Sequence, residues 1–375
     1  MSKKTYQVIG LMSGSSLDGL DLAYCSFEVD TEADNPIAYW QLHIGETIPL
    51  SEKWQTRLFN LPQQQALTFA QTHSYFGHYT AELVNEFIKR HQLEVDFIAA
   101  HGHTIFHYPD KRVTVQIGDG AAIAALTGLP VVNNFRTQDI AINGEGTPLA
   151  PIADKLLFQG YDFYLNLGGI ANITCNANGK YIAFDIGPAN QVFNVLANQL
   201  ELDFDRDGAL AAQAQRIDSL WQQLNEMPYF SKPYPKSLDN NWIREEVFPL
   251  YFADLEAWEN KLHTACLHLA YQTTQSIQQI LTQEQNHKNN YRLLATGGGT
   301  KNKFLLQCIK TACATLAPTE VVVPSADVID FKEAILIALM GVLRVENIPN
   351  CLQTVTGATH DTIGGSIFQG TKKFI

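Results

Sequence analysis

The chain presents the same local pattern twice, an apolar strand followed by a glycine turn and two further strands. The first copy is "TYQVIGLMSGSSLDGLDLAYCSFEV", which starts at Thr5, and it continues into "IAYWQLHIGETI". The second copy is "YDFYLNLGGIANITCNANGKYIAFD", which starts at Tyr161. Segments with helical periodicity alternate with single strands after each copy. The pattern predicts an α/β chain whose two lobes share one architecture and carry mixed sheets, a repeat of topology rather than of residues.

The length of 375 residues also favours two lobes, because a single hydrophobic core seldom grows to this size. The segment "DIAINGEGTPLAP", from Asp139 to Pro151, has two glycines, two prolines and little periodicity. Segments of this composition commonly connect lobes. We therefore expect residues 1–138 with about 355–375 to form the N-terminal lobe, and residues 139–354 to form the C-terminal lobe.

Composition excludes several classes of partner. Lys and Arg number 26 against 38 Asp and Glu, and the resulting charge of −12 disfavours nucleic acid and anionic membranes. Apolar runs stay far below the roughly 20 residues that span a bilayer, and "VIGLM" near the N-terminus is too short for a signal peptide. The six cysteines include no CxxC pair, which favours reduced thiols and a cytoplasmic location.

Helical periodicity is strongest from Ala66 to His91. Further helices are expected at 120–126, 190–200, 255–282, 301–315 and 331–345. A polar, proline-bearing insertion, "YFSKPYPKSLDNNWI" at 229–243, separates two helical regions. Structured insertions of this length are often functional, but the sequence leaves the role of this one open.

Three glycine turns follow three apolar strands: "MSGSSLDG", "NLGGIAN" and "TGGGTKN". Glycine lets the main chain approach a ligand closely, and successive amide groups can converge on phosphate oxygens. A single glycine turn is usually structural, and the chain contains neither GxxxxGK[ST] nor a GxGxxG after its first strand. The order and spacing of the three turns nevertheless favour a nucleotide site.

The turns and the segments between them resemble one known family. The stretches "GLMSGSSLDGLD", "HGHTIFHYP", "NNFRTQDIAINGEGTPLAP", "LNLGGIANIT", "FDIGPAN", "DRDGALAAQ", "PKSL", "TGGGTKN", "VTGAT" and "DFKEAILIALM" occur in family order along nearly the whole chain. They are similar to the anhydro-N-acetylmuramic acid kinases, within the superfamily of actin-like ATPases and sugar kinases.

This resemblance implies an activity and a set of partners. The implied fold has two actin-like lobes, each on a ribonuclease-H-like sheet, with a nucleotide cleft between them. The implied protein is a cytoplasmic homodimer that recycles cell-wall sugar with ATP and Mg²⁺. It opens the ring of 1,6-anhydro-N-acetylmuramic acid hydrolytically and phosphorylates the sugar, which gives N-acetylmuramic acid 6-phosphate and ADP.

The resemblance also assigns residues to the nucleotide. They are Ser13, Gly14, Ser15, Ser16, Leu17, Asp18, Gly19, Leu20 and Asp21 in the first turn, Gly168, Gly169 and Asn172 in the second, and Gly297, Gly298 and Gly299 in the third. Ser15 stands where the family usually has threonine. Met12 and Asn166 stand where the wider superfamily has aspartate, so no metal ligand is assigned.

Asp185 is the expected catalytic base. The bridging oxygen of an anhydro sugar carries no proton, so water must attack the anomeric carbon while that oxygen departs to the γ-phosphorus. Such a water needs a base, and Asp185 follows the strand "YIAF" ahead of the turn "IGPAN". The alternative structural role for Asp185 is to cap the helix near Asn190. The family resemblance favours the base.

Residues for the sugar are expected in three motifs. Arg136 suits the lactyl carboxylate because guanidinium binds carboxylates at two points, and Asp139 follows it in "FRTQD". The resemblance adds His101 and Thr104 in "HGHTIFH" and Asn190 in "FDIGPAN". His103 replaces a glutamine that is common in the family. The histidine spacing also suits zinc, but no acidic or cysteine ligand is nearby, and we expect no metal site there.

Two other functions fit the same fold. An ordinary hexose or amino-sugar kinase would use Asp185 to deprotonate a free hydroxyl, and a non-catalytic actin-like protein would use the nucleotide as a switch. The motifs "GLMSGSSLDGLD" and "NNFRTQDIAINGEG" resemble the anhydro-sugar kinases rather than ordinary kinases.

Overall fold

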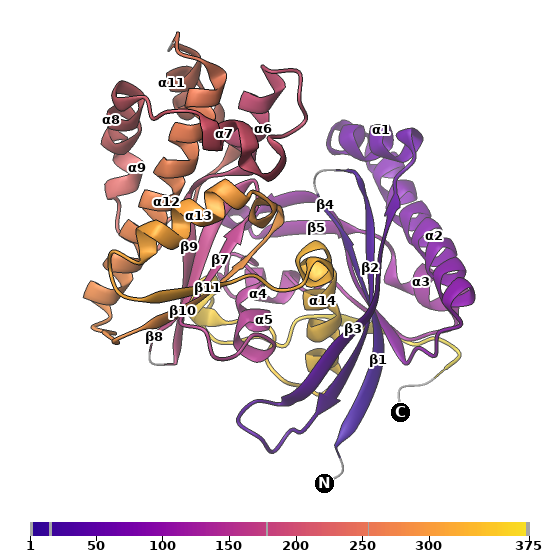
Figure 1. Cartoon of the computed structure of the whole chain (residues 1–375). Helices are drawn as coiled ribbons and strands as arrows, with labels where there is room; N and C mark the ends of the chain where they lie inside the picture. The colour runs from indigo at the N-terminus through magenta and orange to yellow at the C-terminus, as the bar shows by residue number, and fades with distance from the viewer. Residues whose placement is uncertain (1–2, 15–16, 178, 254, 373–375) are drawn as a thin grey trace. The chain divides into compact units, whose positions relative to one another are not determined.

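The computed structural model describes residues 3–14, 17–177, 179–253 and 255–372 (Figure 1). The chain forms two compact units. Unit 1 consists of Met1–Gln159 and Phe331–Ile375, and unit 2 consists of Gly160–Asp330.

Within its described residues, unit 1 is built on a seven-stranded mixed sheet in the order β12-β6-β4-β1-β2-β3, with β5 paired to β4. The strands are β1 Lys4–Ser13, β2 Gly19–Val29, β3 Ile37–Pro49, β4 Phe97–Tyr108, β5 Val113–Ile117, β6 Val131–Asn133 and β12 Ser366–Phe368. The run Val8–Leu11 of β1 is buried throughout because β1 is a central strand with both faces covered.

Helices cover both faces of this sheet (Figure 1). They are α1 Glu52–Asn60, α2 Ala66–His91, α3 Gly120–Thr127, α4 Thr137–Ala141, α5 Pro151–Leu156, α14 Ala326–Val345 and α15 Gln353–Thr356. Helix α2 buries a stripe that includes Phe76, Val84 and Phe87 at helical spacing, and it packs with α3 on one face. On the other face α14 lies against β1 so closely that a Cβ on Gly10 would be 1.9 Å from the carbonyl oxygen of Ala334.

Unit 2 has a five-stranded mixed sheet in the order β11-β10-β7-β8-β9 among the residues described. The strands are β7 Phe163–Leu167, β8 Ile170–Ala177, β9 Lys180–Pro188, β10 Tyr291–Thr296 and β11 Thr319–Val322. The helices are α6 Asn190–Asn198, α7 Ala209–Gln213, α8 Asp218–Glu226, α9 Pro228–Ser231, α10 Asn240–Trp242, α11 Phe248–Ala253, α12 Trp258–Gln283 and α13 Lys303–Cys313. A short π-helix, Ile243–Val247, joins α10 to α11.

The two sheets repeat one topology. In unit 1 the order β3-β2-β1-β4-β6 has antiparallel pairing among its first three strands and parallel pairing from β1 to β4 to β6. In unit 2 the order β9-β8-β7-β10-β11 has the same directions. The predicted α/β class with mixed sheets is confirmed, and the strand–turn–strand pattern seen twice in the sequence opens both sheets.

The compact units differ from the lobes expected from the sequence. Residues 139–159 belong to unit 1 rather than to the second lobe, and the chain passes between units at 159/160 and 330/331. The reason is packing: Asn35 Nδ2 donates to the Leu156 carbonyl at 3.0 Å, and Trp40 Nε1 donates to the Leu157 carbonyl at 3.1 Å. Helix α14, expected in the second lobe, packs on β1 instead. A glycine- and proline-rich segment can therefore lie within a lobe.

Candidate active site

The first turn joins the ends of β1 and β2, and each described residue has a distinct setting. Ser15 and Ser16, both expected at the nucleotide, lie outside the described residues. The Leu17 amide donates to the Gly14 carbonyl at 3.3 Å, and Leu17 has a φ of 62°. A Cβ on Gly19 would be 2.6 Å from Thr47 Cγ2, and Leu20 is buried. Packing therefore accounts for Gly19 and Leu20.

Ser13 ends β1 beside a histidine of β4. Ser13 and His103 are paired across the two parallel strands, and Ser13 Oγ lies 3.0 Å from His103 Nδ1. Both side chains are almost fully buried. Burial lowers the pKa of His103 to about 4, so the imidazole is neutral at physiological pH. The residue that replaces the family's glutamine is thus an uncharged hydrogen-bonding group next to the first turn.

His101 and Arg136 form a second buried pair in unit 1. Nδ1 of His101 lies 3.0 Å from the Gly102 carbonyl and therefore carries the proton, so Nε2 accepts a hydrogen bond from Arg136 Nε at 3.0 Å. Burial and the neighbouring guanidinium lower the pKa of His101 to about 3. Burial also lowers the pKa of Arg136 to about 10, which still leaves it charged at neutral pH. His101 is therefore an uncharged hydrogen-bond acceptor that orients the charged Arg136.

Asp139 has a structural setting that differs from the expected sugar contact. Its side chain is 0% exposed. Oδ1 accepts a hydrogen bond from Thr356 Oγ1 at 2.8 Å, and Oδ2 accepts one from the Gly146 amide at 2.8 Å. These bonds fix the loop that follows α4. A sugar contact through this carboxylate stays a prediction, and its burial argues against it.

A polar cavity of about 300 Å³ lies beside His101 within unit 1. His73, Asp119 and Asn133 also contribute to its walls. Oδ1 of Asn133 is buried and has no hydrogen-bond partner among the described residues. Thr104 lies on β4 nearby in sequence, where its hydroxyl accepts a long, 3.4 Å hydrogen bond from Gln116. The cavity lies beside His101, one of the residues expected to contact the sugar.

The second and third turns contact each other in unit 2. A Cβ on Gly297, whose φ is 84°, would be 2.7 Å from Asn166 Oδ1, and one on Gly299 would be 2.8 Å from Leu167 Cβ. Asn190 Nδ2, which belongs to an expected sugar ligand, donates to the Leu167 carbonyl of the second turn at 3.0 Å. Gly298 is the exposed member of the triple glycine. Gly297 and Gly299 are needed for packing, and Gly298 is available to a ligand.

Gly168 and Gly169 hold the start of α6. The amide of Asn190 donates to the Gly168 carbonyl at 3.1 Å, and the amides of Ala189 and Gln191 donate to the Gly169 carbonyl at 2.9 and 3.2 Å. These carbonyls point toward the helix. Phosphate contacts at this turn, if made by the main chain, would therefore use amide groups.

A row of polar residues crosses the sheet of unit 2 and ends at Asp185. The strand registers pair Thr296 with Asn166, Asn166 with Asn172, and Asn172 with Asp185. Directly paired residues project from the same face of a sheet. Asn172 therefore places a neutral amide group beside the carboxylate, and Asn166 lies one strand further along the same face. In the sequence alone, Asn166 is notable only because it stands where the wider superfamily has aspartate. The row cannot be recognised in the sequence, because it depends on the register between paired strands.

Asp185 lies inside β9, three residues before its end, rather than at the strand's end as the sequence suggested. Its Oδ2 accepts a hydrogen bond from the Leu238 amide at 2.9 Å. Burial raises the pKa of Asp185, and the Leu238 bond acts in the opposite direction. Helix α6 has Ala189 at its N-cap and no side-chain cap. The alternative of helix capping by Asp185 is therefore wrong.

Comparisons with known proteins decide the family. A family model described as anhydro-N-acetylmuramic acid kinase matches residues 6–370. The chain belongs to this family. A protein named anhydro-N-acetylmuramic acid kinase from Shewanella amazonensis is 33% identical over 377 residues, which cover 96% of this chain and 98% of that protein. One of the same name from Methylorubrum populi is 30% identical over 387 residues, with coverage of 96% and 98%.

Among solved structures, the A component of (R)-2-hydroxyglutaryl-CoA dehydratase from Acidaminococcus fermentans is similar at 10% identity and a TM-score of 0.42. The similarity covers 89% of this chain and 96% of that one. Membership in the anhydro-N-acetylmuramic acid kinase family rests on the family model and the relatives.

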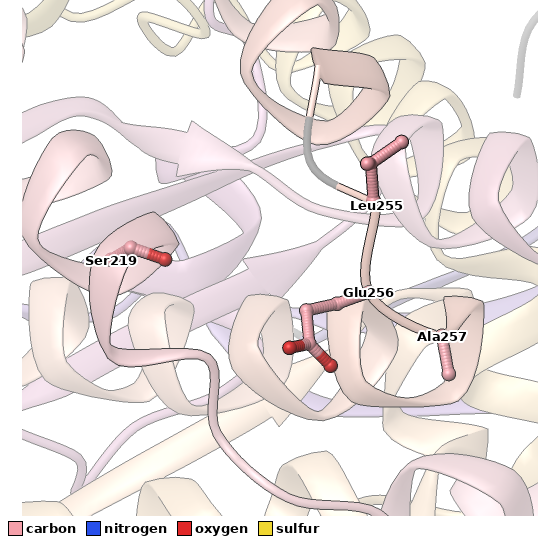
Figure 2. A pocket seen from close by; sticks show the side chains of 4 residues that line it. All are labelled: Ser219, Leu255, Glu256 and Ala257. Atoms are coloured by element: carbon pink, nitrogen blue, oxygen red, sulfur yellow. The ribbon is translucent and has the colours of Figure 1, made fainter.

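Ser219, Leu255, Glu256 and Ala257 line a surface hollow of about 480 Å³ in unit 2, and none of the predicted site residues is among them (Figure 2). In the described part of the chain, His, Cys, Asp and Glu form no group of three that could hold a metal ion. None of the described helices has the length and apolar character to cross a membrane.

Proposed function

We propose that this chain is an ATP-dependent kinase that opens 1,6-anhydro-N-acetylmuramic acid with water and phosphorylates it to N-acetylmuramic acid 6-phosphate. The observation that carries the proposal is the family match over residues 6–370, supported by relatives of the same name at 30–33% identity. The activity belongs to the recycling of cell-wall sugar.

The proposed reaction breaks one bond at the anomeric carbon and one at the γ-phosphorus, and it forms a new bond at each of these atoms. A water oxygen bonds to the anomeric carbon as the bond from that carbon to the bridging oxygen breaks. The bridging oxygen then bonds to the γ-phosphorus of ATP, and the β–γ bridging oxygen leaves with ADP. The proton from water is taken by Asp185, whose raised pKa makes it a better base than an exposed aspartate.

Residues of unit 1 supply the remaining parts of the proposal. The phosphates of ATP bind at the first turn, and Mg²⁺ accompanies them. Arg136, oriented by His101, binds the lactyl carboxylate. The protein acts as a cytoplasmic homodimer, which sedimentation analysis would test.

Mass analysis tests the proposal directly. Incubation with ATP, Mg²⁺ and 1,6-anhydro-N-acetylmuramic acid is expected to yield the phosphosugar. In ¹⁸O-water with early quenching, the label is expected at the anomeric position and not in the phosphate. Label in the transferred phosphate would contradict the mechanism, and phosphorylation of N-acetylglucosamine in preference to the anhydro sugar would favour an ordinary amino-sugar kinase.

The role of Asp185 makes a separate prediction. Asp185→Asn keeps the shape and the acceptor oxygen but cannot take a proton at neutral pH. Turnover is expected to fall by about 10²–10⁴-fold, the range typical for loss of a general base. Binding of ATP and sugar, measured by calorimetry, should change little. Full activity in this variant would remove Asp185 from the chemistry.

A further inference from the structure

The insertion, residues 229–243, contacts Asp185 at three points. The main-chain amide of Asp185 donates to the Lys236 carbonyl at 3.1 Å, and the Asp185 carbonyl accepts a hydrogen bond from the Tyr229 hydroxyl at 2.7 Å. Its carboxylate accepts from the Leu238 amide at 2.9 Å. All of these groups belong to unit 2. Donors and acceptors of one segment therefore hold both the backbone and the side chain of the expected base.

Aromatic packing fixes the insertion on unit 2. The Tyr234 ring stacks on Phe184 with centroids 5.1 Å apart and planes 6° apart, and its hydroxyl donates to Glu284 Oε1 at 2.9 Å. Phe230 meets His268 edge-on at 4.8 Å. Phe230 and Tyr234 thus anchor the segment between the residues that contact Asp185, and such anchoring can hold Asp185 in one geometry.

Lys236 strengthens this anchoring from within the insertion. Its ammonium lies 4.9 Å from the centre of the Tyr229 ring and 5.9 Å from that of Phe184, within the range of cation–π attraction. Nζ also donates to the Tyr229 carbonyl at 3.4 Å. The side chain thus connects the first contact point, Tyr229, to the strand residue that precedes Asp185.

We propose that the insertion positions the catalytic base: the Leu238 amide fixes Oδ2 of Asp185, and Oδ1 is left to take the proton from water. Tyr229 and Lys236 are positioning residues that fix the main chain of Asp185. Among the described residues of unit 2, Oδ1 accepts no hydrogen bond. This inference rests on the proposed function, because it assigns the insertion a role in that reaction.

The contact with Leu238 also sets the direction of a pH effect. A hydrogen bond donated to a carboxylate favours its charged form and lowers its pKa, so loss of the Leu238 amide should raise the pKa of Asp185. The other groups packed around this carboxylate are the Tyr229 phenol, whose pKa burial raises, the Lys236 ammonium on the ring faces, and the neutral Asn172 of β8. A base must be deprotonated to work. As the pH is lowered, activity should therefore be lost at a higher pH than in the wild type.

Two substitutions at one position test this effect. Leu238→Pro removes the amide hydrogen of this residue. Residues 232–239 already hold two prolines and form no helix or strand. Leu238→Ala trims the side chain and keeps the amide. The acid limb of the kcat/KM profile is expected to move to higher pH in Leu238→Pro and to stay in place in Leu238→Ala. Identical limbs in the two variants would overturn the role of this amide.

A second pair keeps the proposal testable if Leu238→Pro does not fold. Tyr229→Phe removes the hydroxyl bound to the Asp185 carbonyl, and Tyr291→Phe removes a hydroxyl that bonds the Asn286 carbonyl at 3.2 Å, away from the insertion. Misplacing a reacting group costs up to about 100-fold in rate. We expect kcat to fall by about 10- to 100-fold in Tyr229→Phe with KM little changed, and to stay near the wild-type value in Tyr291→Phe.

Equal kcat values in the two tyrosine variants would overturn the positioning role of Tyr229. A wild-type protein that makes no phosphosugar would instead contradict the proposed function, so the two failures can be distinguished. Calorimetric ATP binding by each variant reports whether it is folded.

Discussion

At the residue scale, function and stability conflict at Asp185. Its side chain lies in a polar row between strands, where burial raises the pKa and only one amide hydrogen bond opposes that effect. Holding a charged carboxylate in such a place costs free energy, and that cost is what makes the group a useful base. The neutral amides of Asn172 and Asn166 on the same face add no charge that would reverse the shift.

This conflict predicts a stabilising substitution. A raised pKa in the folded state means that ionisation of Asp185 destabilises the fold as pH rises through that pKa. Asp185→Asn removes the charge, so the variant is expected to melt at a higher temperature than the wild type at pH 7. The difference should shrink at acid pH, where the wild-type carboxyl is protonated. Calorimetric scans at several pH values measure it, and a lower Tm for the variant at pH 7 would contradict the argument.

At the scale of elements, the glycine turns combine packing with ligand access. Gly297 has a positive φ and no space for a side chain, and Gly299 packs on Leu167. Gly298 lies between them, and a Cβ there would meet Asn190 Nδ2 at an ordinary 3.8 Å. One turn therefore joins β10 to the second turn and still exposes a flat surface of main chain.

Alanine at neighbouring glycines should separate these two roles. Gly297→Ala is expected to lower the free energy of unfolding by about 1 kcal/mol or more, because alanine is strained at φ 84° and its Cβ would contact Asn166. Gly298→Ala should leave Tm close to that of the wild type and weaken ATP binding. Thermal unfolding and nucleotide titration of both variants test this, and equal losses of Tm would argue against the division of roles.

At the scale of the whole molecule, buried neutral histidines link stability to pH. Burial is the main cause that lowers the pKa of His101 to about 3, of His103 to about 4 and of His268 to about 3. Below pH 6.5 the unfolded chain binds protons at these positions and the folded chain does not. Stability is therefore lost as pH falls from about 6.5 toward 4. Asp185 and Glu333, whose pKa values burial raises, act with the opposite sign, but burial lowers the pKa of four histidines, since His107 belongs with these three.

The expected loss can be measured and assigned. Each such histidine contributes up to about 1.4 kcal/mol per pH unit to the slope of the unfolding free energy. His268→Gln should reduce the fall of Tm between pH 7 and pH 5, because glutamine takes up no proton. His287→Gln, at an exposed position, should leave the fall unchanged. The same pH dependence in wild type and His268→Gln would refute the linkage at this site.

The sequence by itself determined what depends on local patterns. The helix at Ala66–His91 has the predicted bounds, because hydrophobic spacing along one helix needs no partner to be recognised. The strand–glycine–strand openings indicated the fold class, and the ten motifs along the chain indicated the family. Asp185 was singled out by its motif, although not by its environment.

Only the tertiary structure decided what depends on contacts between distant segments. The segment 139–159 joined unit 1 because Asp139 contacts Thr356, which is 217 residues later in the chain. The row from Thr296 to Asp185 required strand register, and the role inferred for the insertion required the contact of Leu238 with Asp185, 53 residues apart. Such pairings are set by the packing of whole elements, and composition and periodicity carry no record of which elements meet.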